Sequence, residues 1–233
     1  MEADQRTIRL MKNVPLFSKM KDEEVAQIAG GCTRKVCQKD RVILVEEEVG
    51  QSLFIILKGT VKVTRTSEEG REVILTMLKA GDFFGELSLL DGKGRSATVI
   101  AMENSELMAL RRAEFLELIE RYPQIAIELL KVLGDRIRKC DLQIESLTLQ
   151  DAVGRVGAAV LHVAEQTGYR RGESVIIPKL PVQQDLANMA GTARETISRI
   201  MALFEAKKLI EREGHRVIIP DFSRFKKEYW AKV

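Results

Sequence analysis

The stretch GDFFGELSLLDGKGRSATV, from Gly81 to Val99, carries the residue types that bind a phosphate. Gly85 and Glu86 introduce a short helix-like piece, and Arg95 and Ser96 follow at the start of a predicted strand. A helix N-terminus, one arginine fork and one hydroxyl together make a compact phosphate cradle. Because Glu86 would repel a phosphate, we expect its carboxylate to accept a hydrogen bond from another group, such as a sugar hydroxyl. A structural role for Gly85, Arg95 and Ser96 is the alternative.

The segments around this stretch have the pattern of short strands. From about Thr33 to Leu110, β-rich runs alternate with turn glycines at about ten-residue spacing, which is typical of a compact all-β sandwich or barrel. The runs are Val42–Val45, Leu53–Leu57, Val61–Thr64, Val73–Leu75, Thr98–Ile100 and Glu106–Leu110, and the glycines are Gly50, Gly59, Gly70 and Gly81. Short helices are expected before them, with an apolar face made of Leu10, Val14, Leu16, Phe17, Val25 and Ile28.

A long helix is predicted from Gln124 to Gln150, opened by Pro123 in its first turn. One set of apolar positions is spaced alternately by three and four residues over about three heptads, which is the pattern of a coiled-coil seam. This set is Leu130, Leu133, Ile137, Cys140, Ile144 and Leu147. A second set, Ile125, Leu129 and Val132, is left to face the β-rich domain. We therefore interpret the seam as a dimer interface; the alternative is a single helix that lies on its own domain.

The C-terminal third contains a second pattern that can do chemistry, starting at Pro181 with PVQQDLANMAGTARETISRI. A small residue at a helix crossing, a turn glycine four residues later and buried aliphatic residues in the next helix are typical of a helix-turn-helix. The small residue is Ala187, the turn residue is Gly191, and Leu186, Ala190, Ile197 and Ile200 occupy the inward positions. Gly191 is expected to adopt a positive φ. Thr192 is expected to cap the second helix, in a capping box with Glu195.

On that second helix Arg194, Glu195, Ser198 and Arg199 lie outward, away from Ile197, Ile200 and Leu203. Arginine can donate two hydrogen bonds to guanine and glutamate can accept one from cytosine, so these side chains are suited to reading DNA bases. A solvated surface helix is the alternative. A β-hairpin wing is predicted directly after this helix, from Leu209–Arg212, a turn at Gly214 and Arg216–Ile219. The wing favours the DNA-binding interpretation over a surface helix. Lys179, Gln183 and Gln184 are expected to contact phosphates, and Thr192 is expected to be a DNA-binding residue as well.

Composition predicts a folded, globular protein. The 233 residues are 45% hydrophobic and 30% charged, which excludes a wholly disordered chain, and three cysteines are too few for a disulfide scaffold. From Asp151 on there are 14 Lys and Arg residues against 10 Asp and Glu residues, so the excess positive charge lies in the C-terminal third.

No nucleophile–base motif or metal-ligand cluster is present in the sequence, and we predict no enzyme activity. Without a membrane-spanning run or a secretory signal, we expect a soluble, cytoplasmic protein with no membrane partner.

The order of a β-roll, a phosphate cradle, a long seam helix and a winged helix-turn-helix resembles the cAMP receptor protein/FNR superfamily of bacterial transcription regulators. FGELSLLDGKGRSATV is similar to that family's phosphate-binding cassette, and GTARETISRI to its recognition helix. The resemblance implies an α+β fold with a cyclic-nucleotide-binding domain over residues 1–122, a dimerisation helix over 123–150 and a DNA-binding domain over 151–233. It also implies that Glu86 holds the ribose 2′-hydroxyl, that Gly85 and Ser96 bind the cyclic phosphate, that Arg95 neutralises its charge and that Leu87 completes this part of the site.

The resemblance further implies the partners. The chain is expected to be a homodimer that binds double-stranded DNA at a TGTGA-like inverted repeat, read by Arg194, Glu195 and Arg199, and that contacts RNA polymerase. The effector is expected to be a cyclic nucleotide, with cAMP favoured over cGMP and other nucleotides, and no cofactor is expected. Cys140 and Asp141 occupy the positions where cAMP-responsive members carry hydroxyl residues that contact the adenine, and Asp141 can accept from adenine or from guanine.

Two other functions fit the same sequence. The first is a regulator of the same family that needs no effector or that responds to oxidation of Cys32 and Cys37. The second belongs to another class, an enzyme-regulatory subunit that uses the cyclic-nucleotide-binding roll. The predicted wing and recognition helix would have no purpose in such a subunit.

Overall fold

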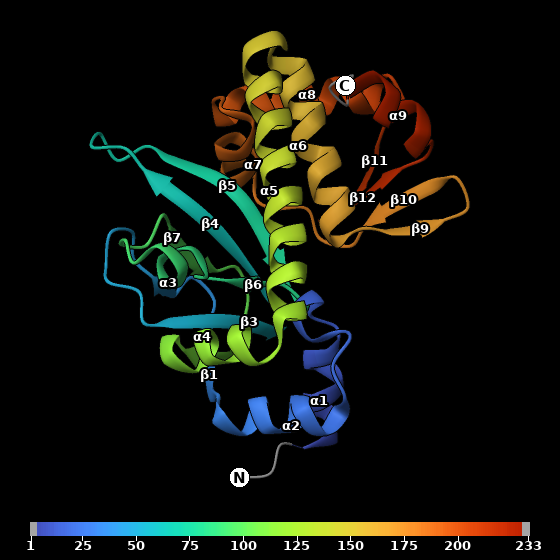
Figure 1. Cartoon of the computed structure of the whole chain (residues 1–233). Helices are drawn as coiled ribbons and strands as arrows, with labels where there is room; N and C mark the ends of the chain where they lie inside the picture. Colours follow the sequence, from blue (N-terminus) through green and yellow to red (C-terminus); the bar gives the residue numbers. More distant parts are fainter. Residues whose placement is uncertain (1–3, 230–233) are drawn as a thin grey trace. The chain divides into compact units, whose positions relative to one another are not determined.

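The computed structural model describes residues 4–229, which form two compact units. The first unit contains the chain up to Ser67 together with Leu75–Arg136, and the second contains Glu68–Ile74 and the chain from Ile137 on. Figure 1 follows the chain from the blue N-terminal helices through the long helix to the red C-terminal helix. Among residues 4–229, no helix is both long and apolar enough to cross a membrane.

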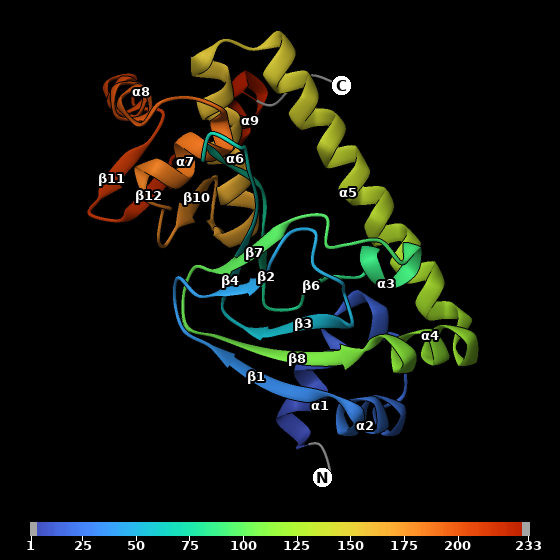
Figure 2. The same ribbon diagram turned by 90° about the vertical axis from the view of Figure 1, so that its left-hand side faces the viewer.

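Two sheets of four strands each form most of the first unit, and only the start of one strand, Glu72–Ile74, is counted with the second unit. One sheet has the order β1-β8-β3-β6 and the other β2-β7-β4-β5; β1, β8 and β3 lie side by side in Figure 2. The strands are β1 (Thr33–Cys37), β2 (Val42–Leu44), β3 (Ser52–Lys58), β4 (Thr60–Thr66), β5 (Glu72–Lys79), β6 (Phe83–Phe84), β7 (Thr98–Ala101) and β8 (Ser105–Arg111). All six predicted strands between Val42 and Leu110 are confirmed, while β1 and β6 add two that the sequence analysis did not predict.

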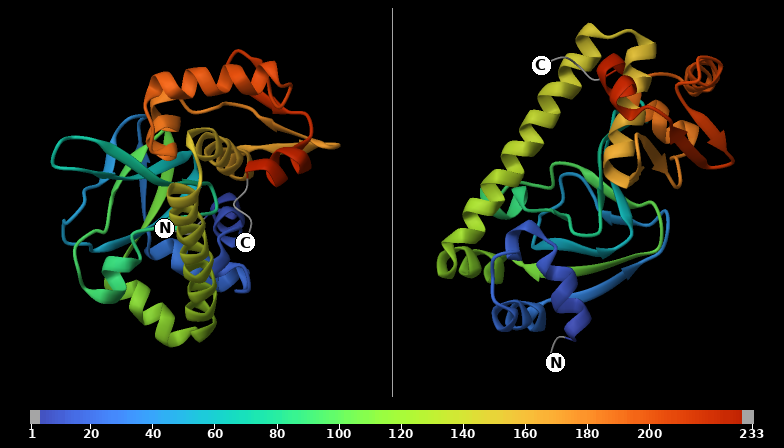
Figure 3. Two further views of the ribbon diagram at one scale, coloured as in Figure 1. Left: turned by 90° about the horizontal axis from the view of Figure 1, so that it is seen from above. Right: turned by 90° about the vertical axis from the view of Figure 1, so that its right-hand side faces the viewer.

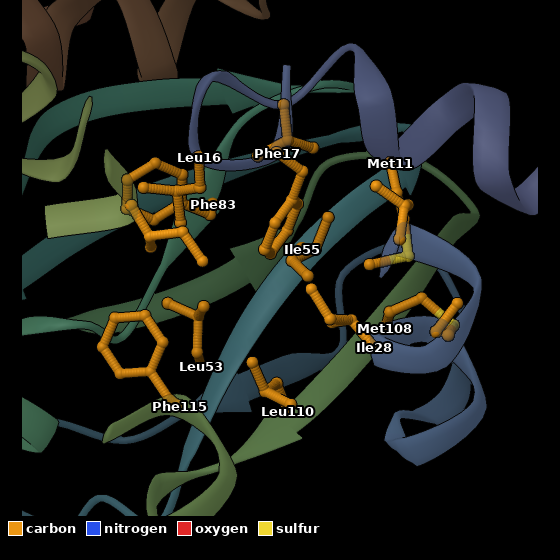
Figure 4. Close-up of a cluster of buried hydrophobic side chains, with 14 of the residues drawn as sticks. Met11, Leu16, Phe17, Ile28, Leu53, Ile55, Phe83, Met108, Leu110 and Phe115 are labelled. Carbon is orange, nitrogen blue, oxygen red and sulfur yellow. The ribbon is translucent and has the colours of Figure 1, made fainter. Parts of the chain in front are cut away.

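Helices cover this β-rich unit and share its core. They are α1 (Gln5–Lys12), the 3-10 helix η1 (Pro15–Phe17), α2 (Asp22–Gly31), α3 (Leu87–Asp91), α4 (Arg112–Arg121) and the first part of α5 (Pro123–Leu149). Figure 4 shows Phe17, Leu53 and Phe83 packed together inside the unit. Burial of such side chains contributes about 1.5–3 kcal/mol each. Ile125 and Leu129 of α5 join this cluster and Val132 packs against it, which confirms the apolar set predicted to face the β-rich domain.

The other face of α5 is exposed and apolar. Leu130, Ile137 and Ile144 follow one another at seven-residue spacing and are 67%, 63% and 64% exposed. Leu147 and Cys140 are exposed as well. Leu133 differs from the rest of the predicted seam, because it is partly buried and packs against the core of the first unit. The helix runs without a break through all 27 residues, as the right-hand view of Figure 3 shows.

The second unit combines helices with a small antiparallel sheet of order β11-β12-β10-β9. Its elements are α6 (Ala152–Thr167), β9 (Tyr169–Arg171), β10 (Ser174–Ile177), α7 (Gln183–Ala190), α8 (Arg194–Ala206), β11 (Glu211–Glu213), β12 (Arg216–Ile219) and α9 (Phe222–Tyr229). The Asp151 side chain caps α6 by accepting a 2.8 Å hydrogen bond from the Gly154 backbone N–H. The rings of Phe204, Phe225 and Tyr229 pack against one another and fix α9 to α8.

The second unit differs from the sequence-based expectations in three places. Tyr169–Arg171 forms β9, a strand that the sequence did not predict, since these residues pair with Ser174–Ile176 of β10. Leu209 and Ile210 precede strand β11 rather than belonging to it, and both are buried. Helix α9 was not predicted, although Phe222, Phe225 and Tyr229 follow the three- and four-residue spacing of a buried helix face.

Candidate effector and nucleic-acid sites

The predicted phosphate cradle lies in the first unit, between β6 and β7. β6 pairs with β3 and leads to Gly85, whose φ of +85° is one that side chains rarely adopt. The chain then turns into α3, with Glu86 at the N-cap position. Arg95 returns to the same place from the segment before β7, and its backbone exchanges hydrogen bonds with Glu47 and Glu48. Gly85, Glu86 and Arg95 are thus brought together, as the sequence predicts.

Glu86 is buried, with only 2% of its surface exposed. One carboxylate oxygen, Oε1, accepts a hydrogen bond of 2.7 Å from Nη1 of Arg136. The other, Oε2, is buried and has no hydrogen-bond partner among residues 4–229. A buried oxygen without a partner is costly, at about 1–3 kcal/mol and more for a charged group. Glu86 therefore offers one acceptor atom that is ready to receive a donor.

Arg136 is a residue of this site that the sequence analysis did not identify. It lies on α5, donates from Nη2 to the Phe83 carbonyl at 2.6 Å, and places its guanidinium 5.0 Å from the centre of the Phe83 ring. The pair with Glu86 joins residues 50 positions apart, and a single arginine on a charged helix carries no sequence signal for such a contact. Arg136 neutralises the buried carboxylate through Oε1 and leaves Oε2 without a hydrogen-bond partner among the described residues.

Arg95 is 6% exposed and held by three oxygen atoms. Its Nη1 donates to the Gly85 carbonyl at 2.7 Å and to the Ser88 hydroxyl at 2.8 Å, and its Nη2 donates to the Ser52 carbonyl at 2.8 Å. Burial lowers the pKa of Arg95, and the negative charges of Glu86 and Glu48 oppose this shift. An arginine stays protonated in a protein all the same. The site therefore contains a fixed positive charge a short way from the unpartnered oxygen of Glu86.

The remaining predicted effector contacts are exposed. Ser96 follows Arg95, and Leu87 begins α3. Cys140 and Asp141 are exposed on the part of α5 that belongs to the second unit. Among the described residues, no group of three or more histidine, cysteine, aspartate or glutamate side chains is arranged to hold a metal ion.

The predicted helix-turn-helix is present in the second unit. α7 ends at Ala190, Gly191 adopts φ +57° and ψ +46°, and α8 begins at Arg194. The residues predicted to point inward are buried: Leu186, Ala187, Ala190, Ile197 and Ile200. A Cβ atom on Gly191 would lie 3.2 Å from Leu147 Cδ2, so this turn sits close to the end of α5. The left-handed backbone favours glycine here, and the Leu147 side chain would have to shift by a few tenths of an ångström to admit a Cβ atom.

Two details of this motif differ from the prediction. The N-cap of α8 is Ala193, without a side-chain cap, so Thr192 does not form the expected capping box; the Thr192 backbone N–H instead donates to the Ala187 carbonyl. Leu203 is exposed rather than inward, and Met201 and Phe204 are buried in its place. Three- and four-residue steps from Ile197 lead to those two positions, whereas Leu203 is six residues away and lies on another side of the helix.

The outward face of α8 carries the predicted reading residues. Arg194, Glu195, Ser198 and Arg199 are all exposed. Gln183 is partly buried, and its Oε1 accepts from Arg194 Nε at 3.5 Å, a long hydrogen bond across the two helices. Gln184 and Lys179 are exposed at the start of α7 and in the loop before it. Polar side chains from both helices thus meet on one surface.

The predicted wing is confirmed as the hairpin of β11 and β12, in which Arg212 pairs with Val217. Two contacts fix it to the helix-turn-helix. The Leu180 backbone N–H, in the loop before α7, donates to the His215 carbonyl at 2.8 Å. Arg212 Nη2 donates to the Glu205 carboxylate of α8 at 2.6 Å. The wing is therefore positioned beside the exposed face of α8.

Comparisons with known proteins agree with this architecture. Residues 34–122 match the family model "Cyclic nucleotide-binding domain", and residues 154–228 match the "Crp-like helix-turn-helix domain". The chain is 36% identical over 192 residues to the "Cyclic AMP receptor protein" of Thermus thermophilus, covering 82% of this chain and 85% of that one. It is 31% identical to a "CRP-like cAMP-activated global transcriptional regulator" of Mycobacterium tuberculosis, over 80% of this chain and 83% of that one.

A solved structure is similar as well. The "Thermus thermophilus Catabolite Activator Protein" is 32% identical, with a TM-score of 0.53, over 91% of this chain and 97% of that one. The name of the Mycobacterium relative describes a transcriptional regulator, and that of the Thermus relative a cyclic AMP receptor. Two matched domains in the predicted order, and relatives that span most of the chain, establish the family. The chain belongs to the CRP/FNR family of transcription regulators, with a cyclic nucleotide-binding domain followed by a Crp-like helix-turn-helix domain.

Proposed function

We propose that this regulator binds a cyclic nucleotide, with cAMP favoured, in the cradle of Glu86 and Arg95, and that binding controls its affinity for DNA. The observation that carries the proposal is the buried Oε2 of Glu86, which lacks a partner while Arg136 occupies Oε1. A ribose 2′-hydroxyl supplies the donor that Oε2 needs. Arg95 supplies a positive charge for the cyclic phosphate. Ser96 follows it in the chain, and the Gly85 carbonyl accepts a hydrogen bond from its Nη1 at 2.7 Å.

Names of relatives support cAMP as the effector. Those of Mycobacterium tuberculosis and Haemophilus influenzae are called cAMP-activated. Cys140 and Asp141 replace the hydroxyl residues expected from the resemblance, and an aspartate accepts from adenine N6 or from guanine N1 and N2. Calorimetric titration of the purified chain with cAMP, cGMP and a cyclic dinucleotide tests this part. Binding of cAMP at the lowest Kd supports it, and binding of none of the three contradicts it.

The DNA target is proposed to be a TGTGA-like inverted repeat. Arg194, Glu195 and Arg199 are exposed on α8, where arginine can read guanine and glutamate can read cytosine in the major groove. Gln183, Gln184 and Lys179 would contact phosphates and fix the register. Fluorescence anisotropy with labelled duplexes, with and without the effector, tests the proposal. Equal affinity for the repeat and for a scrambled duplex would rule out the assigned reading.

The functional form is proposed to be a homodimer, joined through the exposed stripe of Leu130, Ile137 and Ile144 on α5. Two copies that pair along this stripe would remove its side chains from water and present two recognition helices to half-sites about 34 Å apart. Ile137→Glu is expected to yield monomers in sedimentation velocity, whereas Glu145→Gln is a control outside the stripe.

We also propose that the DNA-bound dimer contacts RNA polymerase. A gel-shift assay in which the dimer leaves the recruitment of polymerase to DNA unchanged would argue against this contact.

Control by oxidation of Cys32 and Cys37 has less support. Burial raises the pKa of the Cys32 thiol to about 12. Because the thiolate is the reactive form, this thiol is unreactive at neutral pH. Operator binding that changes with oxidant but with no cyclic nucleotide would favour the redox alternative.

A further inference from the structure

Ser88 belongs to the cradle, although neither the sequence analysis nor the resemblance assigned it a role. It lies on α3 and is only 4% exposed. Its Oγ accepts from Arg95 Nη1 at 2.8 Å and donates to the Gly85 carbonyl at 3.4 Å. The other two acceptors of Arg95 are backbone carbonyls, those of Gly85 and Ser52. Ser88 is thus the side chain that holds this guanidinium.

Two glycines leave room for the pair of Arg95 and Ser88. A Cβ atom on Gly85 would lie 2.6 Å from Arg95 Nη1. A Cβ atom on Gly50 would lie 2.1 Å from Ser88 Oγ and 2.8 Å from Arg95 Cζ. Real Cβ atoms do not approach other atoms so closely, so the guanidinium and the hydroxyl together fill a slot between the two glycine backbones.

The donors of Arg95 can be counted. A guanidinium has five N–H donors. Among the described residues, both hydrogens of Nη1 and one of Nη2 are used, by Gly85, Ser88 and Ser52. Two donors remain, one at Nε and one at Nη2. Two parallel N–H donors are what an arginine presents to a phosphate in a bidentate contact.

We propose that Ser88 is the positioning residue of the cradle: by taking one hydrogen of Arg95 Nη1, it directs the two remaining donors of Arg95 at the phosphate of the effector. The proposal deepens the function proposed above and rests on it. Without the hydroxyl, Nη1 loses one of its two acceptors inside a buried slot, and the guanidinium, held by the Gly85 and Ser52 carbonyls alone, can tilt. The fixed pair of donors is then lost, together with its preference for one exocyclic phosphate oxygen.

The test compares wild type with Ser88→Ala in calorimetric titrations of the full chain. The probes are cAMP and the two diastereomers of its phosphorothioate, in which sulfur replaces one or the other exocyclic oxygen. For Ser88→Ala we expect the Kd for cAMP to rise about tenfold and the ratio of the two diastereomer affinities to move towards one. Loss of a merely structural contact would weaken both diastereomers alike and leave their ratio unchanged. Ser18→Ala is the matched control, because the exposed Ser18 hydroxyl donates to the Pro15 carbonyl in the same unit.

The outcomes separate the two proposals. A wild-type chain that binds no cyclic nucleotide overturns the proposed function and the role of Ser88 with it. A wild type that binds cAMP, together with a Ser88→Ala variant of unchanged Kd and unchanged diastereomer ratio, overturns the role of Ser88 alone. If Ser88→Ala unfolds at a lower temperature, Ser88→Thr, which keeps a hydroxyl, should restore the diastereomer ratio even where its added methyl group lowers stability. Failure of that rescue in a folded variant also contradicts the proposal.

Discussion

The cradle of the first unit and the reading surface of the second place their charged groups in opposite ways. Glu86 and Arg95 are buried and held by hydrogen bonds, Glu86 to Arg136 and Arg95 to Gly85, Ser88 and Ser52. Arg194 and Arg199 are exposed, and their position comes from the buried face of the same helix. A small ligand is recognised by a few desolvated groups, whereas DNA is recognised by solvated groups on a rigid support.

The largest expected effect tests the buried side of this comparison. Arg95→Leu removes the positive charge and leaves the Gly85 and Ser52 carbonyls without their donor, so the Kd for cAMP should rise by about 100-fold or more. Calorimetry measures the affinity. Arg65→Leu is the control, since Arg65 is exposed and pairs with Glu46. Wild-type affinity in Arg95→Leu would show that the cradle has been wrongly located.

The exposed side of the comparison predicts a smaller effect per residue. Arg199→Ala should weaken binding to the specific repeat by about 10- to 100-fold, because one good base contact contributes about 1–3 kcal/mol. Binding to a scrambled duplex should change much less. Arg224→Ala makes the same change in charge on α9, away from the recognition helix. An equal loss in both variants would mean that overall charge, and not base reading, governs the affinity.

A third prediction concerns the turn between α7 and α8, which fixes the position of the recognition helix. Gly191→Ala and Gly172→Ala both place a side chain at a positive φ, of +57° and +64°. Each should cost about 1–2 kcal/mol in the free energy of unfolding. The added Cβ meets Leu147 only at position 191, whereas it meets nothing within 4 Å at position 172. Urea unfolding should therefore show the larger loss for Gly191→Ala, and that variant alone should bind the operator more weakly.

The smallest effect is a pH dependence of the second unit. His162 lies on α6 with a buried Nε2 that has no partner among the described residues, and burial lowers its pKa, helped by the charge of Lys139 and opposed by Glu165. The folded protein then binds a proton less readily than the unfolded chain does. The free energy of unfolding should therefore have its full value above pH 6.5, which is the usual pKa of histidine, and should decrease as the pH falls below 6.5.

Thermal unfolding at pH 7.5 and pH 5.5 measures this effect. His162→Gln should reduce the difference in Tm between the two pH values, while His215→Gln, at the exposed wing, should keep it. A difference in Tm that is the same in wild type and in His162→Gln would assign the pH dependence to other groups.

The sequence alone predicts most elements of the fold and most residues of both sites. Strands, the long helix and the helix-turn-helix follow from the spacing of apolar residues and from turn glycines such as Gly191. Local patterns did not reveal the pair of Arg136 and Glu86, because a contact between residues far apart in the chain depends on tertiary packing. Ser88 was missed for a related reason. Its hydroxyl accepts a hydrogen bond from Arg95, which is seven residues further along the chain. From its place in α3, Ser88 cannot be told apart from any other small buried residue.

The slot around Arg95 also governs which changes the chain tolerates. Positions 50 and 85 contribute no side chain, yet any side chain there would displace the guanidinium. In a saturation library selected for effector response, these two positions should be among the least permissive in the first unit. A search for ligand contacts alone would overlook these glycines, because their role is to add no side chain to space that Arg95 and Ser88 occupy.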